Sequence, residues 1–201
     1  MLRVGITGGI GSGKTTVCKL FELQGIAIFY ADQEAKKAMS TDQQLMSDIR
    51  TQFGNDIYSS EGTLNRSKLA SIVFNDDRQL AMLNSIVHPA VFRLFDEWVD
   101  QQTSAYVIKE AALLFESNSY KDCHSTILVK SPELMRISRV VKRDRITEQD
   151  VLKRMAKQLG DNEKEKLSEY VIINDERTLI IPQVLDLHSE FLKRAQLNDT
   201  I

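Results

Sequence analysis

Five short apolar runs interrupt a chain that is otherwise rich in polar residues, at 2–6, 25–30, 105–108, 126–129 and 170–173. Each run has the length of one buried strand. After the first run the spacing changes, because Val17, Leu20 and Phe21 fall on one face of a helix over 14–23, and Gly25 is placed to end it. This alternation of strand and helix predicts an α/β fold.

The segment 33–102 lacks such strands, and its pattern is polar and helical. Asn65 or Ser67 can begin one of its helices, whose apolar face would carry Leu69, Ile72, Val73 and Phe74. A later helix contains Pro89, which must kink or restart it because proline lacks a backbone donor and clashes with the preceding turn. We expect an inserted helical region here.

Residues 8–15, with the sequence GGIGSGKT, match the pattern G-x-x-x-x-G-K-[ST] behind the first apolar run. In this pattern glycines turn backbone N–H groups toward phosphate oxygens, Lys14 reaches the β- and γ-phosphates, and the Thr15 hydroxyl binds Mg²⁺. The N-terminus of the next helix adds its positive dipole. A flexible Gly/Ser turn with a stray lysine is the alternative, which the flanking strand and helix disfavour. The sequence therefore predicts a user of ATP or a similar nucleotide, with Mg²⁺.

Acidic residues follow two of the predicted strands. In open α/β sheets ligands lie beyond the carboxyl ends of the strands, so Asp32 is expected to face the phosphate loop. It can also cap a helix that starts near Gln33, and the two roles are compatible. Glu110 or Glu116 can serve a ligand or a metal, although each can equally be a solvated or helix-start carboxylate.

A dense cationic run follows the fourth predicted strand. Ser131 and Pro132 predict a helix with a serine cap and proline at its first position. The helix carries Arg136, Arg139, Lys142, Arg143 and Arg145. Arg139 and Arg143 are four residues apart, so they share one side and can close over a triphosphate. A solvated charged face is the alternative.

The C-terminal part predicts two more helices. Thr147, followed three residues later by Asp150, resembles a capping box and begins a short helix that should reach Leu159. Pro182 is expected to open a terminal helix after the last strand. We assign no function to His124 or His188.

Composition excludes some classes of protein. With 201 residues, 42% of them hydrophobic and 27% charged, the chain fits one α/β domain with insertions. A net charge of −2 gives no bulk attraction to nucleic acid or to an anionic membrane. No apolar run approaches the roughly 18 residues of a membrane helix. The two cysteines form no CxxC pair and suggest reduced thiols, so we expect a cytoplasmic protein. Separately, we expect the protein to be a monomer.

Taken together, these motifs resemble the dephospho-CoA kinase family along nearly the whole chain. The matching stretches, in order, are residues 6–15, 30–32, 61–66, 86–89, 113–116, 139–144 and 171–174. The first stretch is generic to many kinases, whereas the ordered set is much more specific.

The resemblance implies a phosphotransferase with an alcohol group as acceptor, which moves the ATP γ-phosphoryl group to the ribose 3′-hydroxyl of dephospho-CoA, the last step of coenzyme A synthesis. It also implies a P-loop, adenylate-kinase-like core of five parallel strands. The expected boundaries are 1–32, 104–137 and 166–201 for this core, 33–103 for a helical CoA-binding region, and 138–165 for a lid.

Residue roles carry over at the matching positions. Asp32 resembles the catalytic carboxylate, with Lys14 and Arg143 as stabilising cations. The implied ATP-binding set is Gly9, Gly11, Ser12, Gly13, Lys14, Thr15, Thr16, Arg139, Arg143 and Asn174, with Thr15 also at the metal. The implied acceptor contacts are Asp32, Arg66, His88 and Glu116, although a lone histidine such as His88 is often structural. The chain departs from the family at Ala112, where proline is frequent, which leaves the turn there undetermined.

Two other functions remain open at this point. Another small-molecule P-loop kinase, for a nucleoside or a sugar acid, would share the loop, the aspartate and the lid but differ in the helical region. A GTPase or ATP-driven switch is disfavoured, because the chain has no Asn-Lys-x-Asp run for guanine and no Asp-x-x-Gly switch after the loop.

Overall fold

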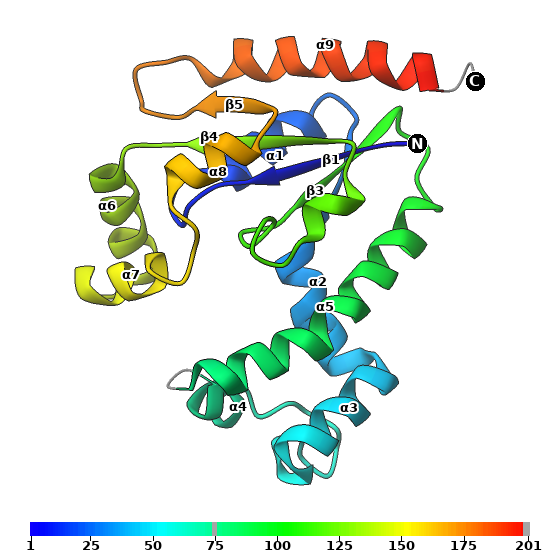
Figure 1. Ribbon diagram of the computed structural model, residues 1–201, viewed down its shortest axis with the longest axis vertical. Helices are drawn as coiled ribbons and strands as arrows, with labels where there is room; N and C mark the ends of the chain where they lie inside the picture. The colour runs from blue at the N-terminus through cyan, green and yellow to red at the C-terminus, as the bar shows by residue number, and fades with distance from the viewer. Residues whose placement is uncertain (74–75, 199–201) are drawn as a thin grey trace. The chain divides into compact units, whose positions relative to one another are not determined.

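The structure, a computed structural model, describes residues 1–73 and 76–198 (Figure 1). Phe74 lies outside the described residues. The chain divides into two compact units, which are described separately. The sheet unit comprises Met1–Tyr30 and Gln101–Ile201, and the helical unit comprises Ala31–Asp100. The finer division into core, acceptor-binding region and lid stays a prediction.

A parallel sheet organises the sheet unit. Its strands are β1 (Leu2–Thr7), β2 (Ala27–Tyr30), β3 (Tyr106–Glu110), β4 (Ser125–Lys130) and β5 (Tyr170–Ile173). Their order is β2-β3-β1-β4-β5, and every neighbouring pair is parallel. The register pairs Ile6 of β1 with Glu110 of β3 and Ile127 of β4. The predicted five-stranded α/β fold is confirmed, and the carboxyl ends of these strands share one edge.

The two faces of β1 differ, as alternation along a strand requires. Val4 and Ile6 are fully buried in the main core, to which α1 (Lys14–Glu22) and α9 (Ile180–Asn198) contribute Phe21 and Phe191. Gly5 faces the other way, where an added Cβ would come within 2.8 Å of Leu114. Burying one such large apolar side chain stabilises the fold by about 1.5–3 kcal/mol, so this core fixes α1 and the loop before it.

Three helices lie between β4 and β5, namely α6 (Glu133–Asp144), α7 (Glu148–Met155) and α8 (Asp161–Leu167). A second, small core joins the first two of them. Ile137, Val140 and Val151 are buried between α6 and α7, and Ile10 of the glycine loop packs against them. The glycine loop is therefore in direct apolar contact with the α6–α7 pair.

The helical unit consists of α2 (Ala31–Thr41), α3 (Gln43–Phe53), α4 (Arg66–Val73) and α5 (Asp77–Val99), with a short 3-10 helix, η1 (Asn55–Ile57). α5 contacts α2, α3 and α4. Asp42 caps α3 by accepting from Leu45 N at 3.1 Å, and its carboxylate also pairs with Arg93 of α5. Asn65 caps α4 by accepting from Lys68 N at 3.0 Å, which confirms Asn65 as the helix start.

Several predicted boundaries are wrong. The third strand extends through Glu110, because the sheet buries Lys109 and Glu110 as well as the apolar run. The helix after β2 begins at Ala31, so Asp32 lies in its first turn and is not its cap. α5 is continuous through Pro89, so the proline does not restart it.

Three other helix ends also differ. α6 begins at Glu133, and the Ser131 hydroxyl makes no cap bond, because it accepts instead from Arg139 at 3.0 Å. α7 does have Thr147 as its cap, with Asp150 N donating to its hydroxyl at 3.2 Å, but it ends at Met155 and not at Leu159. α9 begins two residues before Pro182.

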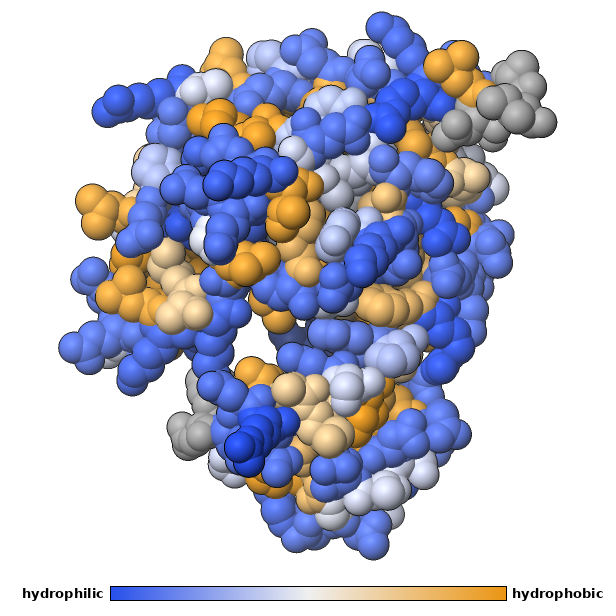
Figure 2. Space-filling view, in the orientation of Figure 1, coloured by the Kyte–Doolittle hydropathy of each residue, from blue (hydrophilic) through white to orange (hydrophobic). Residues whose placement is uncertain are grey.

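The visible surface is mainly hydrophilic, with apolar residues interspersed among charged ones (Figure 2). Among the described helices, none combines the length and the apolar character that a membrane-crossing helix needs.

Candidate active site

The glycine loop links β1 to α1 at the carboxyl edge of the sheet. Gly13 adopts φ 92° at the N-terminus of α1, a left-handed conformation that favours glycine. Gly11 is also left-handed, with φ 79°, and a Cβ there would lie 2.5 Å from the Arg136 carbonyl oxygen. The loop therefore needs glycine both for its turn and for its close contact with α6.

Lys14 and Thr15 open α1 at this loop. The buried Lys14 ammonium donates to the Gly8 carbonyl oxygen at 2.9 Å. This bond connects the end of the loop to its beginning. Thr15 and Thr16 follow in the first turn and are exposed. The Ser12 hydroxyl is buried and has no hydrogen-bond partner among the described residues. An unpaired buried donor is costly, so this hydroxyl fits an anionic oxygen that arrives with a ligand.

Asn174 directly follows β5 and is buried against the loop. Its amide donates to the Ser12 carbonyl oxygen at 2.7 Å. The same nitrogen occupies the space that a Cβ on Gly13 would need. The structure therefore brings Asn174 to the predicted loop residues, as a support for their backbone, whereas its predicted contact with ATP stays a prediction.

Arg139 lies beside the loop. Its guanidinium donates to the Gly11 carbonyl oxygen at 3.4 Å and to the Ser131 hydroxyl at 3.0 Å, and it pairs with Glu176 at 3.0 Å. A cation thus lies next to the loop backbone, paired with an exposed carboxylate, and its predicted contact with ATP stays a prediction.

Arg143 is placed differently. It forms a two-pronged bond with Asp144, at 2.7 Å and 3.1 Å, and its side chain is 63% exposed. Hydrogen bonding to Arg143 lowers the pKa of Asp144, and the same bond raises the pKa of Arg143. Asp144 also accepts from Arg154 of α7 at 3.1 Å. The structure thus joins Arg143 to α7 and not to the loop, and its phosphate contact stays a prediction.

The two candidate glutamates have different surroundings. Glu116 accepts from Leu159 N at 2.8 Å and pairs at 3.1 Å with Lys164, which is fully buried. Glu110 ends β3, in register with Ile6 and Tyr30. Burial first, and then the charge of Glu110, raise the pKa of the Cys18 thiol, which Lys14 opposes. The charges of Glu110 and Lys14 therefore act in opposite directions on one thiol of α1.

Three predicted site residues belong to the helical unit. Asp32 lies in the first turn of α2, two residues after the end of β2. Arg66 is the first residue of α4. His88 lies on α5, and its ring stacks on Phe92 with centroids 6.2 Å apart. Their roles toward a substrate stay predictions.

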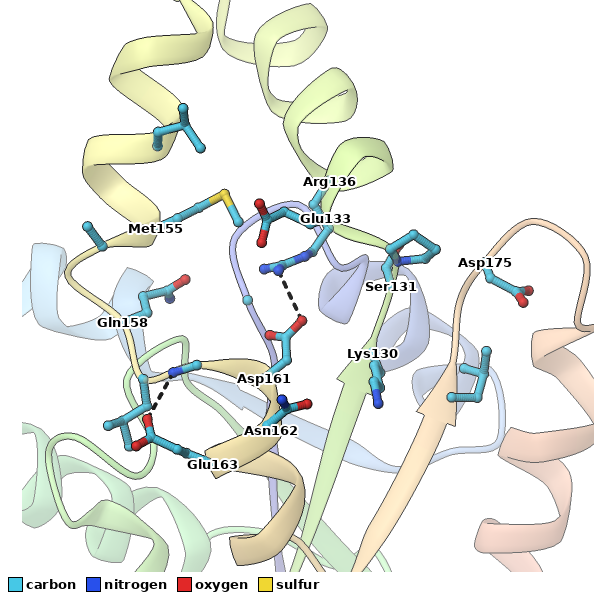
Figure 3. Close-up of a pocket in the computed structure, with 17 residues that line it drawn as sticks. Lys130, Ser131, Glu133, Arg136, Met155, Gln158, Asp161, Asn162, Glu163 and Asp175 are labelled. Atoms are coloured by element: carbon cyan, nitrogen blue, oxygen red, sulfur yellow. Dashed lines mark hydrogen bonds and ion pairs between the residues drawn. The ribbon is translucent and has the colours of Figure 1, made fainter.

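A pocket of about 920 Å³ adjoins the loop at Gly9 (Figure 3). α6, α7, the segment 158–163 and the ends of β4 and β5 enclose it. Its charged lining residues are Lys130, Glu133, Arg136, Asp161, Glu163 and Asp175. Carboxylates outnumber cations in this set, so a polyphosphate is disfavoured here, and the loop with the N-terminus of α1 is the better phosphate site.

Two side chains contact the loop in ways that sequence reasoning does not predict, since it places Arg136 only in the cationic run and does not single out Gln158. The Arg136 guanidinium packs on Gly9, where a Cβ would collide with it, and pairs with Asp161 at 3.0 Å (Figure 3). Gln158 accepts from Ile10 N at 2.9 Å. The cationic run gives no sign that Arg136 packs on Gly9, and no local pattern marks a glutamine that binds a backbone 148 residues away.

Comparisons with known proteins show the family of this chain. A family model described as dephospho-CoA kinase matches residues 2–179. The dephospho-CoA kinase of Bacteroides fragilis (strain YCH46) is 34% identical over 187 residues, which cover 92% of this chain and 91% of that one. The dephospho-CoA kinase of Salinibacter ruber is 40% identical over 178 residues, covering 87% and 89%.

A solved structure, the dephospho-CoA kinase from Campylobacter jejuni, is similar in fold, with a TM-score of 0.69 and 23% identity. It covers 95% of this chain and 97% of that one. The parallel sheet and the glycine loop at its carboxyl edge define a P-loop kinase. More narrowly, the chain belongs to the dephospho-CoA kinase family.

Proposed function

We propose that this protein transfers the γ-phosphoryl group of ATP to the ribose 3′-hydroxyl of dephospho-CoA. Family membership over residues 2–179 is the single observation that carries the proposal. The glycine loop is consistent with it, because a left-handed Gly13 at the start of α1 offers backbone amides and a helix N-terminus to one anion.

Cations and positioning perform most of the catalysis of phosphoryl transfer, because the charge of the loose transition state lies on the equatorial oxygens. Lys14 is the central cation, since its ammonium already lies inside the loop at the Gly8 carbonyl. Arg139 is the second, at the Gly11 carbonyl. We propose that Arg143 joins them after it leaves Asp144, with which it is paired at the protein surface.

Mg²⁺ fits this site only if the protein and the nucleotide coordinate it together. Within the described ranges, no three His, Cys, Asp or Glu side chains gather closely enough to hold a metal ion. We propose that the Thr15 hydroxyl and the Glu110 carboxylate face the ion, and that ATP phosphate oxygens complete its coordination. Glu110 is preferred to Glu116 because Lys164 and Leu159 N already occupy an oxygen of Glu116. When bound, Mg²⁺ neutralises charge on the transferred group.

Asp32 is the proposed catalytic carboxylate. It follows the carboxyl end of β2 by two residues, and ligands of α/β sheets lie beyond that end. Asp32 carries a carboxylate, whose oxygens accept hydrogen bonds. It can orient the ribose hydroxyl and accept its proton late in the transfer. We propose Arg66 and His88, with Glu116, as contacts of the acceptor.

The proposal includes the setting of the enzyme. We propose that it acts in the cytoplasm, as a monomer, and that its only ligands are small molecules. Sedimentation of the purified chain with and without ATP tests the oligomeric state.

The experiment that tests the function is product identification. The purified chain is incubated with Mg-ATP and dephospho-CoA, and the product is analysed by mass and by ³¹P NMR. We expect one added phosphoryl group, on the ribose 3′-oxygen. Lys14→Ala should reduce turnover by about a hundredfold or more, the scale of losing a well-placed charge stabiliser. Lys19→Ala, an exposed lysine on the same helix, is the matched control. ATP hydrolysis that does not depend on the acceptor would contradict the proposal.

A further inference from the structure

The segment 158–164 consists of the end of the α7–α8 connection and the first turn of α8, and it contacts the glycine loop through Gln158. Figure 3 shows Gln158 and Asp161 of this segment beside the pocket. Three of its side chains bind other parts of the sheet unit. Gln158 contacts the loop itself, Asp161 pairs with Arg136, and Lys164 pairs with Glu116. Arg136 in turn lies on Gly9.

Gln158 connects two separate backbones. Its Oε1 accepts from Ile10 N at 2.9 Å, and its Nε2 donates to the Ala112 carbonyl oxygen at 3.3 Å. Ile10 lies between two glycines of the loop, and Ala112 lies two residues beyond β3. One side chain therefore ties the phosphate loop to the end of the neighbouring strand, and its amide uses both an acceptor and a donor to do so.

The surroundings hold Gln158 in place. The next residue, Leu159, donates its N–H to Glu116 at 2.8 Å. The fully buried Lys164 pairs with Glu116 at 3.1 Å and also donates to the Ala112 carbonyl oxygen at 3.3 Å. A buried ion pair of this kind is poorly replaced by water, so the backbone on both sides of Gln158 is anchored.

A glycine-rich loop needs such a support. Its glycines give it many accessible conformations, whereas phosphoryl transfer depends on backbone N–H groups that are oriented before the phosphate arrives. Ile10 is the residue of the loop that lies between Gly9 and Gly11, and its peptide N–H is bound by Gln158. Fixing this peptide plane restricts the two adjoining ones.

We propose that Gln158 is a positioning residue, which holds the phosphate loop in its ligand-binding conformation through the Ile10 N–H. The kinetic part of this inference rests on the proposed use of ATP. The structural part does not depend on which acceptor is phosphorylated.

The first test measures amide hydrogen exchange of Ile10 by NMR in the ligand-free protein. Gln158→Leu removes both hydrogen bonds, so exchange at Ile10 should become about tenfold faster, the scale of one net hydrogen bond. Gln149→Leu, at an exposed position of α7, is the matched control and should leave Ile10 unchanged. Unchanged Ile10 exchange in Gln158→Leu would overturn the proposal.

A more conservative variant separates the hydrogen bond from general disruption, and it serves if Gln158→Leu does not fold. Gln158→Glu keeps an acceptor for the Ile10 N–H and removes the donor to Ala112. Ile10 should therefore stay protected in this variant. Equal loss of protection in both variants would show that disruption of the segment, and not this bond, is responsible, and would count against the proposal.

The second test is kinetic. For Gln158→Leu, kcat/KM for ATP should fall by about tenfold per folded molecule, while the Kd for dephospho-CoA alone changes by less than about twofold. A merely structural glutamine would instead lower the folded fraction and leave the activity of the folded molecules intact, which would overturn the proposal. If the preferred acceptor is another alcohol, the exchange result still decides the role of Gln158.

Discussion

The Asn174 side-chain amide donates to the Ser12 carbonyl oxygen across 2.7 Å and so joins the end of β5 to the phosphate loop, 162 residues earlier in the chain. The same nitrogen fills the space beside Gly13. Gln158 adds a second connection, between this loop and the chain that follows β3, the strand beside β1.

Asn174→Ala should weaken the use of ATP. The Ser12 carbonyl loses its donor and Gly13 loses a packing partner, so we expect kcat/KM for ATP to fall by about tenfold. Steady-state kinetics with dephospho-CoA at saturation measure this. Asn162→Ala, at an exposed asparagine of α8, is the control. Equal kinetics of the two variants would contradict the support role.

Asp32→Asn should lower kcat by roughly 10² to 10⁴, the contribution of a positioned base, while ATP binding survives. Asp32 lies in the first turn of α2, so the lost charge should cost only about 0.3–1 kcal/mol of stability. Glu34→Gln removes a second carboxylate from the same turn and should leave kcat within about twofold. If Asp32→Asn mainly unfolds the protein and the folded fraction keeps its activity, the helix role of Asp32 is the important one.

Arg143→Ala should lower kcat by at least about tenfold while the Kd for dephospho-CoA alone changes little, because the charge that Arg143 meets develops on the transferred group. Arg143→Lys should restore only part of the activity, since lysine lacks the two-pronged fork that matches phosphate. Lys142→Ala, at the exposed neighbour, is the control. Normal turnover of Arg143→Ala would leave this cluster a solvated charged face, held by Asp144 as the structure has it.

The stability of the sheet unit should depend on pH through His188. Its Nδ1 lies 2.8 Å from the Tyr106 hydroxyl, and burial lowers the pKa of His188. The folded state thus favours the neutral ring, so this contribution to stability is present above the unfolded pKa of about 6.5 and is lost as the pH falls below it.

The measurement is the change in Tm between about pH 7.5 and about pH 5.5. The wild-type Tm should fall by more than that of His188→Gln, which cannot take up a proton. An equal fall in both proteins would show that the histidine does not contribute.

Much of the sheet could be predicted from local pattern, since four or five consecutive apolar residues have few alternatives to a buried strand. β5 begins and ends where the pattern predicts. β3 ends later than the pattern predicts. Its last two residues are Lys109 and Glu110, and from their polarity alone we would predict that they lie outside a buried strand. Charged residues are buried there because the neighbouring strands and Asp122 provide partners.

The site could be predicted only where chemistry is encoded in adjacent residues. The loop of Gly8 to Thr15 is such a motif. Helix starts are harder to predict. The Ser131 hydroxyl accepts from Arg139 and does not cap α6, and this contact depends on a residue eight positions away. The contacts of Arg136 and Gln158 with the loop could not be predicted, because each joins distant parts of the chain.

The central claim, that dephospho-CoA is the acceptor, is tested most directly by internal competition. One reaction contains Mg-ATP and equal concentrations of dephospho-CoA, adenosine and gluconate, and the early product ratio gives the ratio of the kcat/KM values. We predict that coenzyme A is formed in at least about a hundredfold excess, because a site that hydrogen-bonds its substrate strongly rejects analogues that leave its polar groups unpaired. Comparable or faster phosphorylation of adenosine or gluconate would contradict the assignment.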